Sequence, residues 1–163
     1  MLRIGFVAAF VGALVLGPST SFAFDDSAAL QGMTEGKIAF DITDGGGKLL
    51  LKRLDIIDET RRSLIQQGVK PHFVITFRGP ATRLVQTEMD KIAPEDREAA
   101  RAVAAKIDAM SKESGVDGME QCSVAAHEQG TKPDKVMPAI KVVGNGFISL
   151  MAYQARGYAY IRP

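Results

Sequence analysis

Cys122 is the only cysteine in the sequence and the side chain best suited to covalent chemistry. A cysteine thiolate is a strong nucleophile and can exchange with disulfides or hold a further sulfur atom. Cys122 ends a predicted strand, and residues 123–125 would offer it backbone N–H groups if they open a helical turn. Arg78 or His127, if it lies close to Cys122 in the folded chain, would add positive charge near the thiolate. The alternative is a packed, unreactive cysteine, the commoner state of a single cysteine on a strand.

A glycine-rich stretch, 44–48, follows the first predicted strand and looks at first like a phosphate-binding loop. A Walker sequence needs glycine at position 42 and serine or threonine at position 49, where the chain has Ile42 and Leu49. The spaced glycines of a dinucleotide-binding loop are also missing. We therefore interpret 44–48 as a tight turn from strand to helix, with Asp44 near the N-terminus of that helix.

The two histidines give little support to a metal site. His72 and His127 lie far apart in the sequence, and Thr131 stands where a zinc-protease motif starting at His127 needs its second histidine. The Gly-x-Ser-x-Gly motif of the α/β-hydrolases is absent. The sequence thus predicts no metal ligands and no bound cofactor, and it leaves Cys122 as the candidate catalytic residue.

Alternating strands and helices must position these residues. Strands are predicted at 37–43, 72–77, 117–123, 139–143 and 158–161, and helices, counted with their caps, at 48–68, 81–92, 94–115 and 145–157. The buried stripes are expected to be Leu50, Leu54, Ile57, Leu64 and Ile65 in the first helix and Val103, Ile107 and Met110 in the third. Such alternation predicts an α/β fold with a mainly parallel sheet and helices on both faces.

The functional crevice of a parallel sheet lies beyond the carboxyl ends of its strands. Four loops are expected to meet there: 43–47, 78–81, 122–127 and 144–146. The candidate site residues on these loops are Cys122 as the catalytic group and, as binding groups, Asp44, Gly45, Arg78, Gly79, His127 and Asn145. Asn145 is also the predicted N-cap of the last helix.

The first residues indicate export. Arg3 precedes an apolar run at 4–16, and Ser21 and Ala23 provide the small residues that a signal peptidase requires. We predict a signal peptide over 1–23 with cleavage after Ala23, an N-terminal arm over 24–36 and a single domain over 37–163. A membrane anchor is the alternative, but the run is shorter than the about 20 residues that a bilayer core needs. We expect a periplasmic protein with no membrane insertion after cleavage.

The net charge and the cysteine content exclude two features, a nucleic-acid partner and an internal disulfide. The formal net charge is +1 and no block of Lys or Arg occurs, so we expect no nucleic-acid partner. A single cysteine cannot form an intramolecular disulfide in an oxidising compartment, so the fold must be stable through packing alone.

Three segments of the C-terminal third are distinctive: 132–138, 140–143 and, most specifically, 157–163. Asp44-Gly45, residues 77–80 and the cysteine before a polar loop are supporting features. Together they resemble the DsrE/DsrF-like family (YchN-like small α/β domains). The resemblance covers roughly residues 37–163. It implies a three-layer α/β/α sandwich with a five-stranded sheet, often assembled as a homotrimer, homohexamer or mixed hexamer.

In the sulfur-relay members of that family a cysteine carries persulfide sulfur to or from a partner protein, and Cys122 aligns with that position. This chain differs from the relay members in two features. The relay members work in the cytoplasm, whereas this chain carries a predicted export signal, and residues 123–127 match no relay motif.

Two hypotheses follow. In the first, Cys122 accepts, holds and passes on sulfane sulfur as a carrier or sulfurtransferase, with a protein as sulfur donor or acceptor. In the second, the domain is a non-catalytic small-ligand-binding or oligomeric assembly module with a structural cysteine. Phe147, Met151 and Tyr153 on the last helix are expected to form an exposed apolar surface for homo-oligomerisation.

Overall fold

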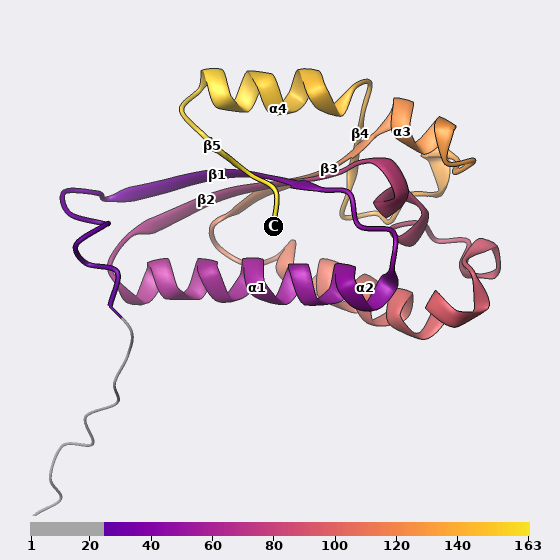
Figure 1. Cartoon of the computed structure of the whole chain (residues 1–163), viewed down its shortest axis with the longest axis horizontal. Helices are drawn as coiled ribbons and strands as arrows, with labels where there is room; N and C mark the ends of the chain where they lie inside the picture. Colours follow the sequence, from indigo (N-terminus) through magenta and orange to yellow (C-terminus); the bar gives the residue numbers. More distant parts are fainter. Residues whose placement is uncertain (1–24) are drawn as a thin grey trace, which may run out of the picture.

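The computed structural model describes residues 25–163, so the predicted signal peptide, 1–23, lies outside the described residues. Within residues 25–163, five strands form one sheet in the order β4-β3-β2-β1-β5, and every neighbouring pair is parallel (Figure 1). The strands are β1 (Glu35–Ile42), β2 (Lys70–Phe77), β3 (Val116–Cys122), β4 (Lys141–Val143) and β5 (Ala159–Ile161). The predicted α/β class with a parallel five-stranded sheet is confirmed.

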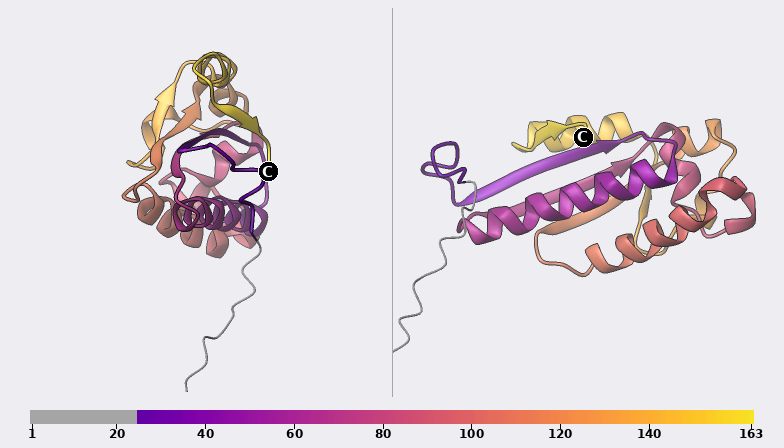
Figure 2. Two further views of the ribbon diagram at one scale, coloured as in Figure 1. Left: turned by 90° about the vertical axis from the view of Figure 1, so that its left-hand side faces the viewer. Right: turned by 60° about the horizontal axis from the view of Figure 1, so that its bottom comes forward.

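Helices lie on both faces of the sheet and complete the expected three layers (Figure 2). The helices α1 (Gly47–Gln66) and α2 (Arg97–Met110) pack side by side on one face, and α4 (Gly146–Ala155) covers the other. The short helix α3 (Ser123–Glu128) follows directly on β3. In the described part of the chain, no helix has both the length and the apolar character that a bilayer crossing requires.

The main core lies between the sheet and the α1/α2 layer. Its largest fully buried members come from β1, β2, α1 and α2, and they include Ile42, Phe73, Phe77, Leu50, Leu54, Ile57 and Ile107. The predicted stripe of α2 is buried as expected. In α1 the predicted stripe is fully buried through Ile57, Leu64 is partly buried against the core, and Ile65 in the last turn is exposed, contrary to the prediction. Burial of this apolar face is the principal stabilising contribution to the domain.

The predicted helix at 81–92 is wrong. Two short 3-10 turns, Gly79–Leu84 and Met89–Lys91, stand in its place. Between them the backbone pairs with a distant segment: the N–H of Thr87 donates to the carbonyl of Lys135, and the N–H of Met137 donates to the carbonyl of Val85. These long-range bonds take the groups that an α-helix would have used internally, so tertiary pairing overrides the local helical pattern.

The remaining boundaries differ by a few residues. β1 begins at Glu35, inside the stretch predicted as an arm, and β4 and β5 are shorter than expected. A 3-10 turn at Pro94–Asp96 leads into α2, so the proline lies just before the helix that it was predicted to open. The Asn145 side chain caps α4 by accepting the N–H of Phe147 at 2.9 Å, as predicted.

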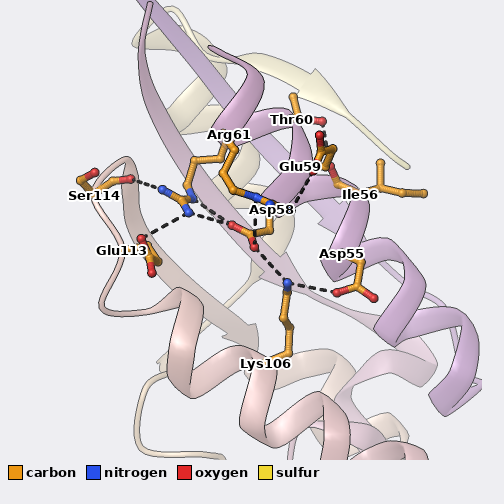
Figure 3. Close-up of polar contacts among 10 residues, drawn as sticks. Asp55, Ile56, Asp58, Glu59, Thr60, Arg61, Lys106, Glu113 and Ser114 are labelled. Carbon is orange, nitrogen blue, oxygen red and sulfur yellow. Dashed lines mark hydrogen bonds and ion pairs between the residues drawn. The ribbon is translucent and has the colours of Figure 1, made fainter. Parts of the chain in front are cut away.

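A charged network joins α1 to α2 and to the turn before β3 (Figure 3). Arg61, nearly fully buried, donates two bonds to Asp58 and one to the carbonyl of Ser114. Lys106 on α2 lies 3.0 Å from carboxylate oxygens of both Asp58 and Asp55. The network therefore fixes how the two helices lie against each other.

The opposite face of the sheet, beneath α4, is polar. Asp41, Thr76 and Glu120 are in register on β1, β2 and β3, and all three are buried. Ser149 and Tyr153 on α4 both donate hydroxyl hydrogen bonds to the Glu120 carboxylate, the Tyr153 bond at 2.9 Å. Hydrogen bonds to Glu120 hold α4 on the sheet, whereas α1 and α2 are held mainly by apolar packing.

Candidate functional site

Cys122 is the last residue of β3 and the N-cap of α3. Its side chain is 3% exposed, and its sulfur accepts two backbone N–H groups, from Ala125 at 3.4 Å and from Gly146 at 3.1 Å. Strand and helix follow each other without a loop, which keeps the sulfur at the carboxyl edge of the sheet. Two backbone N–H donors, one from α3 and one from α4, are thus directed at one sulfur.

Gly146 brings one of these donors to the sulfur because it lacks a side chain. A Cβ at this position would lie 2.5 Å from Cδ of Arg78 and 3.0 Å from Cβ of Cys122. The first turn of α4 can therefore approach β3 this closely only with glycine. The same contact places Arg78 and Cys122 next to each other, since both touch one point of the backbone.

Arg78 follows β2 and is held by a carboxylate from β1. Its Nε donates to Oδ1 of Asp41 at 2.7 Å and its Nη2 donates to Oδ2. Asp41 is fully buried and also accepts the hydroxyl of Tyr160, on β5, at 2.7 Å. Hydrogen bonding to Asp41 is the main cause that raises the pKa of Arg78, so this side chain is a permanent cation.

The Arg78 guanidinium is also stacked on an aromatic ring, with its central carbon 4.1 Å from the ring centroid of Phe147 on α4. This is a cation–π contact. Three elements other than its own, β1, β5 and α4, thus determine where this side chain lies, directly or through Asp41.

A cavity of about 250 Å³ adjoins the sulfur. Its lining comes from the ends of β2 and β3, from α3 and from the start of α4: Arg78, Gly79, Cys122, Val124, Ala125, Glu128, Asn145 and Phe147. Cys122 is thus nearly fully buried and still forms part of the wall of a cavity. A small group bonded to Cys122 has room beside it.

The structure brings together part of the predicted site. Arg78, Gly79 and Asn145 line the cavity with Cys122, and the expected N–H donor from residues 123–125 is that of Ala125. The second donor, Gly146, was predicted only as part of a loop and not as a contact of the sulfur.

Three predicted residues lie elsewhere. Asp44 pairs with Arg53 at 3.4 Å, and Gly45 packs against Pro80 near a separate cavity. β1 is two strands away from β3, about 10 Å at the usual strand spacing, so the loop after β1 does not reach the sulfur. His127 is exposed in the last turn of α3 and is not among the residues that line the Cys122 cavity.

The sequence did not place Asp41 or Tyr160 at the site, and it placed Phe147 only on the exposed face of the last helix and not against Arg78. A signal for Asp41 was present, because an aspartate inside an otherwise apolar buried strand needs a cationic or hydrogen-bonding partner. The partners themselves depend on sheet order: Tyr160 reaches Asp41 only because β5 pairs with β1.

The described residues, 25–163, hold no group of three or more His, Cys, Asp or Glu side chains able to bind a metal ion. His72 and Asp117 do pair, with 3.0 Å between Nδ1 and Oδ2, and Tyr158 donates to the same carboxylate. They lie at the starts of β2 and β3, the end of the sheet opposite Cys122.

Comparison with known proteins supports the fold and leaves the activity open. No protein-family model matches the chain. An uncharacterised protein of Aquifex aeolicus is 26% identical over 125 residues, which are 77% of this chain and 55% of that protein. The chain thus spans about half the length of this curated relative.

A solved structure of a protein of unknown function from Methanobacterium thermoautotrophicum has a similar fold. It superposes with a TM-score of 0.55 at 16% sequence identity, covering 79% of this chain and 98% of that one. At this identity the likeness shows a shared small α/β fold.

Proposed function

We propose that this chain is an exported DsrE-like protein that carries sulfane sulfur as a persulfide on Cys122, as a sulfur carrier or sulfurtransferase of the periplasm. The observation that most supports it is the position of the sulfur, which is shielded from solvent yet adjoins a cavity of about 250 Å³. One more sulfur atom needs little of that space, given that a water molecule takes about 30 Å³ in the liquid. The resemblance of residues 132–138, 140–143 and 157–163 to the DsrE/DsrF-like family supports the same function.

The loading step is an exchange at sulfur. Cys122 first gives its proton to solvent, and the thiolate attacks a terminal sulfur of a sulfane donor such as inorganic polysulfide. A new S–S bond forms, the S–S bond of the donor breaks, and its electron pair leaves on the shortened polysulfide. The cysteine sulfur is oxidised to the extent that the leaving sulfur is reduced. Passing the sulfur to an acceptor thiolate reverses these roles.

The test is to incubate the native protein with polysulfide, remove the excess and measure the intact mass. We expect a gain of one sulfur atom, reversed by dithiothreitol and absent in Cys122→Ser. A wild-type protein that gains no sulfur while folded would contradict the proposal and favour the non-catalytic module with a structural cysteine. Cys122→Ser is a close match in size, so it keeps the fold as a control.

Export has its own test. The full chain is produced in a bacterial host, and the N-terminus of the periplasmic protein is sequenced. Cleavage after Ala23 gives a mature start at Phe24. A protein retained in the cytoplasm with Met1 in place would contradict export and leave the sulfur chemistry untouched.

We also propose that the outer face of α4 is covered by a second copy of the chain. α4 contains no charged residue, and it exposes Phe147, Ile148 and Met151 at 66%, 61% and 57%. A helix that is apolar on its outer face is typical of a buried helix. Tyr153, expected in this surface, instead turns inward and bonds Glu120. The family resemblance points to a homotrimer or homohexamer.

A further inference from the structure

The Arg78 guanidinium has N–H groups that Asp41 does not use. A guanidinium has five N–H groups, and Asp41 takes one from Nε and one from Nη2. Within residues 25–163 no other side chain accepts a hydrogen bond from this guanidinium. Because Asp41 holds the Nε/Nη2 edge, the opposite edge, formed by Nη1 and the second N–H of Nη2, is free for a ligand.

The free edge belongs to a side chain that lines the Cys122 cavity. Arg78 Cδ and Cys122 Cβ both lie within 3.0 Å of the position that a Cβ on Gly146 would occupy. The guanidinium also stacks on the ring of Phe147, another residue of the cavity lining. A cation and the cysteine thus line one cavity, and the contacts that hold the cation do not involve the sulfur.

We propose that Asp41 and Tyr160 are positioning residues, which orient Arg78 so that its free edge holds the sulfur anion in the cavity, first the thiolate of Cys122 and then the terminal sulfur of its persulfide. The second half rests on the proposed function, and the first half does not. Asp41 fixes the edge of the guanidinium, and Tyr160 fixes Asp41 from β5. Tyr160 acts two contacts away from the sulfur, through Asp41 and Arg78.

The other charged group at the cavity is Glu128 on α3, which is exposed at the rim and therefore screened by solvent. Arg78 is accordingly the one cation among the lining residues. Loss of its orientation leaves only the N–H groups of Ala125 and Gly146 to stabilise negative charge on the sulfur.

The first experiment measures the rate of alkylation of native Cys122 by iodoacetamide from about pH 5 to about pH 10. We expect Arg78→Gln to move the rate profile to higher pH, and Tyr160→Phe and Asp41→Asn to move it in the same direction by a smaller amount. Tyr158→Phe is the matched control, because it removes a similar tyrosine-to-aspartate bond, to Asp117 at 2.9 Å, at the other end of the sheet. Its profile should equal that of the wild type.

A wild-type profile in Tyr160→Phe and Asp41→Asn overturns the positioning role, and a wild-type profile in Arg78→Gln overturns the role of the cation. A native wild-type protein that cannot be alkylated at all overturns both. Tyr160→Phe deletes one hydroxyl from an exposed strand, so it decides the question even if Asp41→Asn does not fold.

The second experiment follows the decay of the persulfide after loading with polysulfide. We expect faster loss in Arg78→Gln and Tyr160→Phe than in the wild type and Tyr158→Phe. Equal decay in all four overturns the persulfide half of the inference. Failure of the wild type to load overturns the proposed function instead, and the alkylation profiles still decide the positioning of Arg78 beside the thiolate.

Discussion

Gly146 is the residue on which the surroundings of the Cys122 sulfur depend most directly. Gly146→Ala would place a methyl group against Arg78 and the cysteine, whereas the same change at Gly144 meets no atom within 4 Å. We expect Gly146→Ala to lower the free energy of unfolding by about 1–3 kcal/mol, as overpacking does, and Gly144→Ala to leave it unchanged. Chemical denaturation measures both. Equal stability of the two variants would show that α4 can shift away from β3 at no cost.

The three tyrosines give a prediction at high pH. Burial, followed by hydrogen bonding to Asp117, raises the pKa of Tyr158 from its ordinary 10.0 to about 12, and a hydrogen bond to Asp41 is the main cause that raises the pKa of Tyr160. Burial and then Glu120 raise the pKa of Tyr153. Tyrosinate absorbance should therefore rise at higher pH in the native protein than in the unfolded chain.

The same shifts predict a sign for stability. A group whose pKa is higher in the folded state stabilises the fold fully below its unfolded pKa, and this contribution is lost as pH rises. The window for Tyr158 runs from 10.0 to about 12. The free energy of unfolding should fall across it, and less steeply in Tyr158→Phe. A variant with the wild-type slope would contradict the role of Tyr158.

At the scale of elements, the network of Figure 3 gives a pair of matched substitutions. Arg61 is 6% exposed and Arg62 is 54% exposed, yet both contact Asp58. Arg61→Ala removes a nearly buried guanidinium that donates to Asp58 and to the carbonyl of Ser114, while Lys106 still contacts Asp58. We expect a loss of about 1–3 kcal/mol, whereas Arg62→Ala should change stability by less than about 1 kcal/mol. Thermal or urea unfolding distinguishes them. Similar losses would mean that Lys106 alone holds the two helices together.

Most elements could be predicted from local patterns, because their causes are local. Apolar spacing indicated α1 and α2, Asn145 marked the start of α4, and Gly157, with φ of +85°, marks its end. The segment 81–92 could not be predicted in this way, since its backbone is paired with residues 135–137, far along the chain. The candidate site likewise has one feature that local sequence predicts and one that depends on distant strand pairing. The place of Cys122 at the end of a strand was predictable, but its contact with Gly146 depends on β4 lying beside β3, which the sequence does not state.

At the scale of the whole molecule, the outer face of α4 predicts assembly. Ile148 on α4 is 61% exposed and Ile56 on α1 is 43% exposed. If a second copy covers α4, Ile148→Glu should convert an oligomer into a monomer in light scattering, because a buried unpaired charge opposes association. Ile56→Glu, on the opposite layer, should leave the assembly intact. A wild-type monomer at high concentration would remove this proposal, and dissociation by both variants would place the interface elsewhere.

The position of β5 has a consequence for synthesis. β1 lies between β2 and β5, so an early strand gains its second neighbour only from residues 159–161. Tyr160, which holds Asp41, comes later in the chain than every residue that lines the Cys122 cavity. Because a ribosome delivers the chain from its N-terminal end, the thiol emerges well before the hydroxyl that anchors its cationic neighbour. Until residues 159–161 pair with β1, Asp41 therefore lacks the hydroxyl that it accepts in the folded domain.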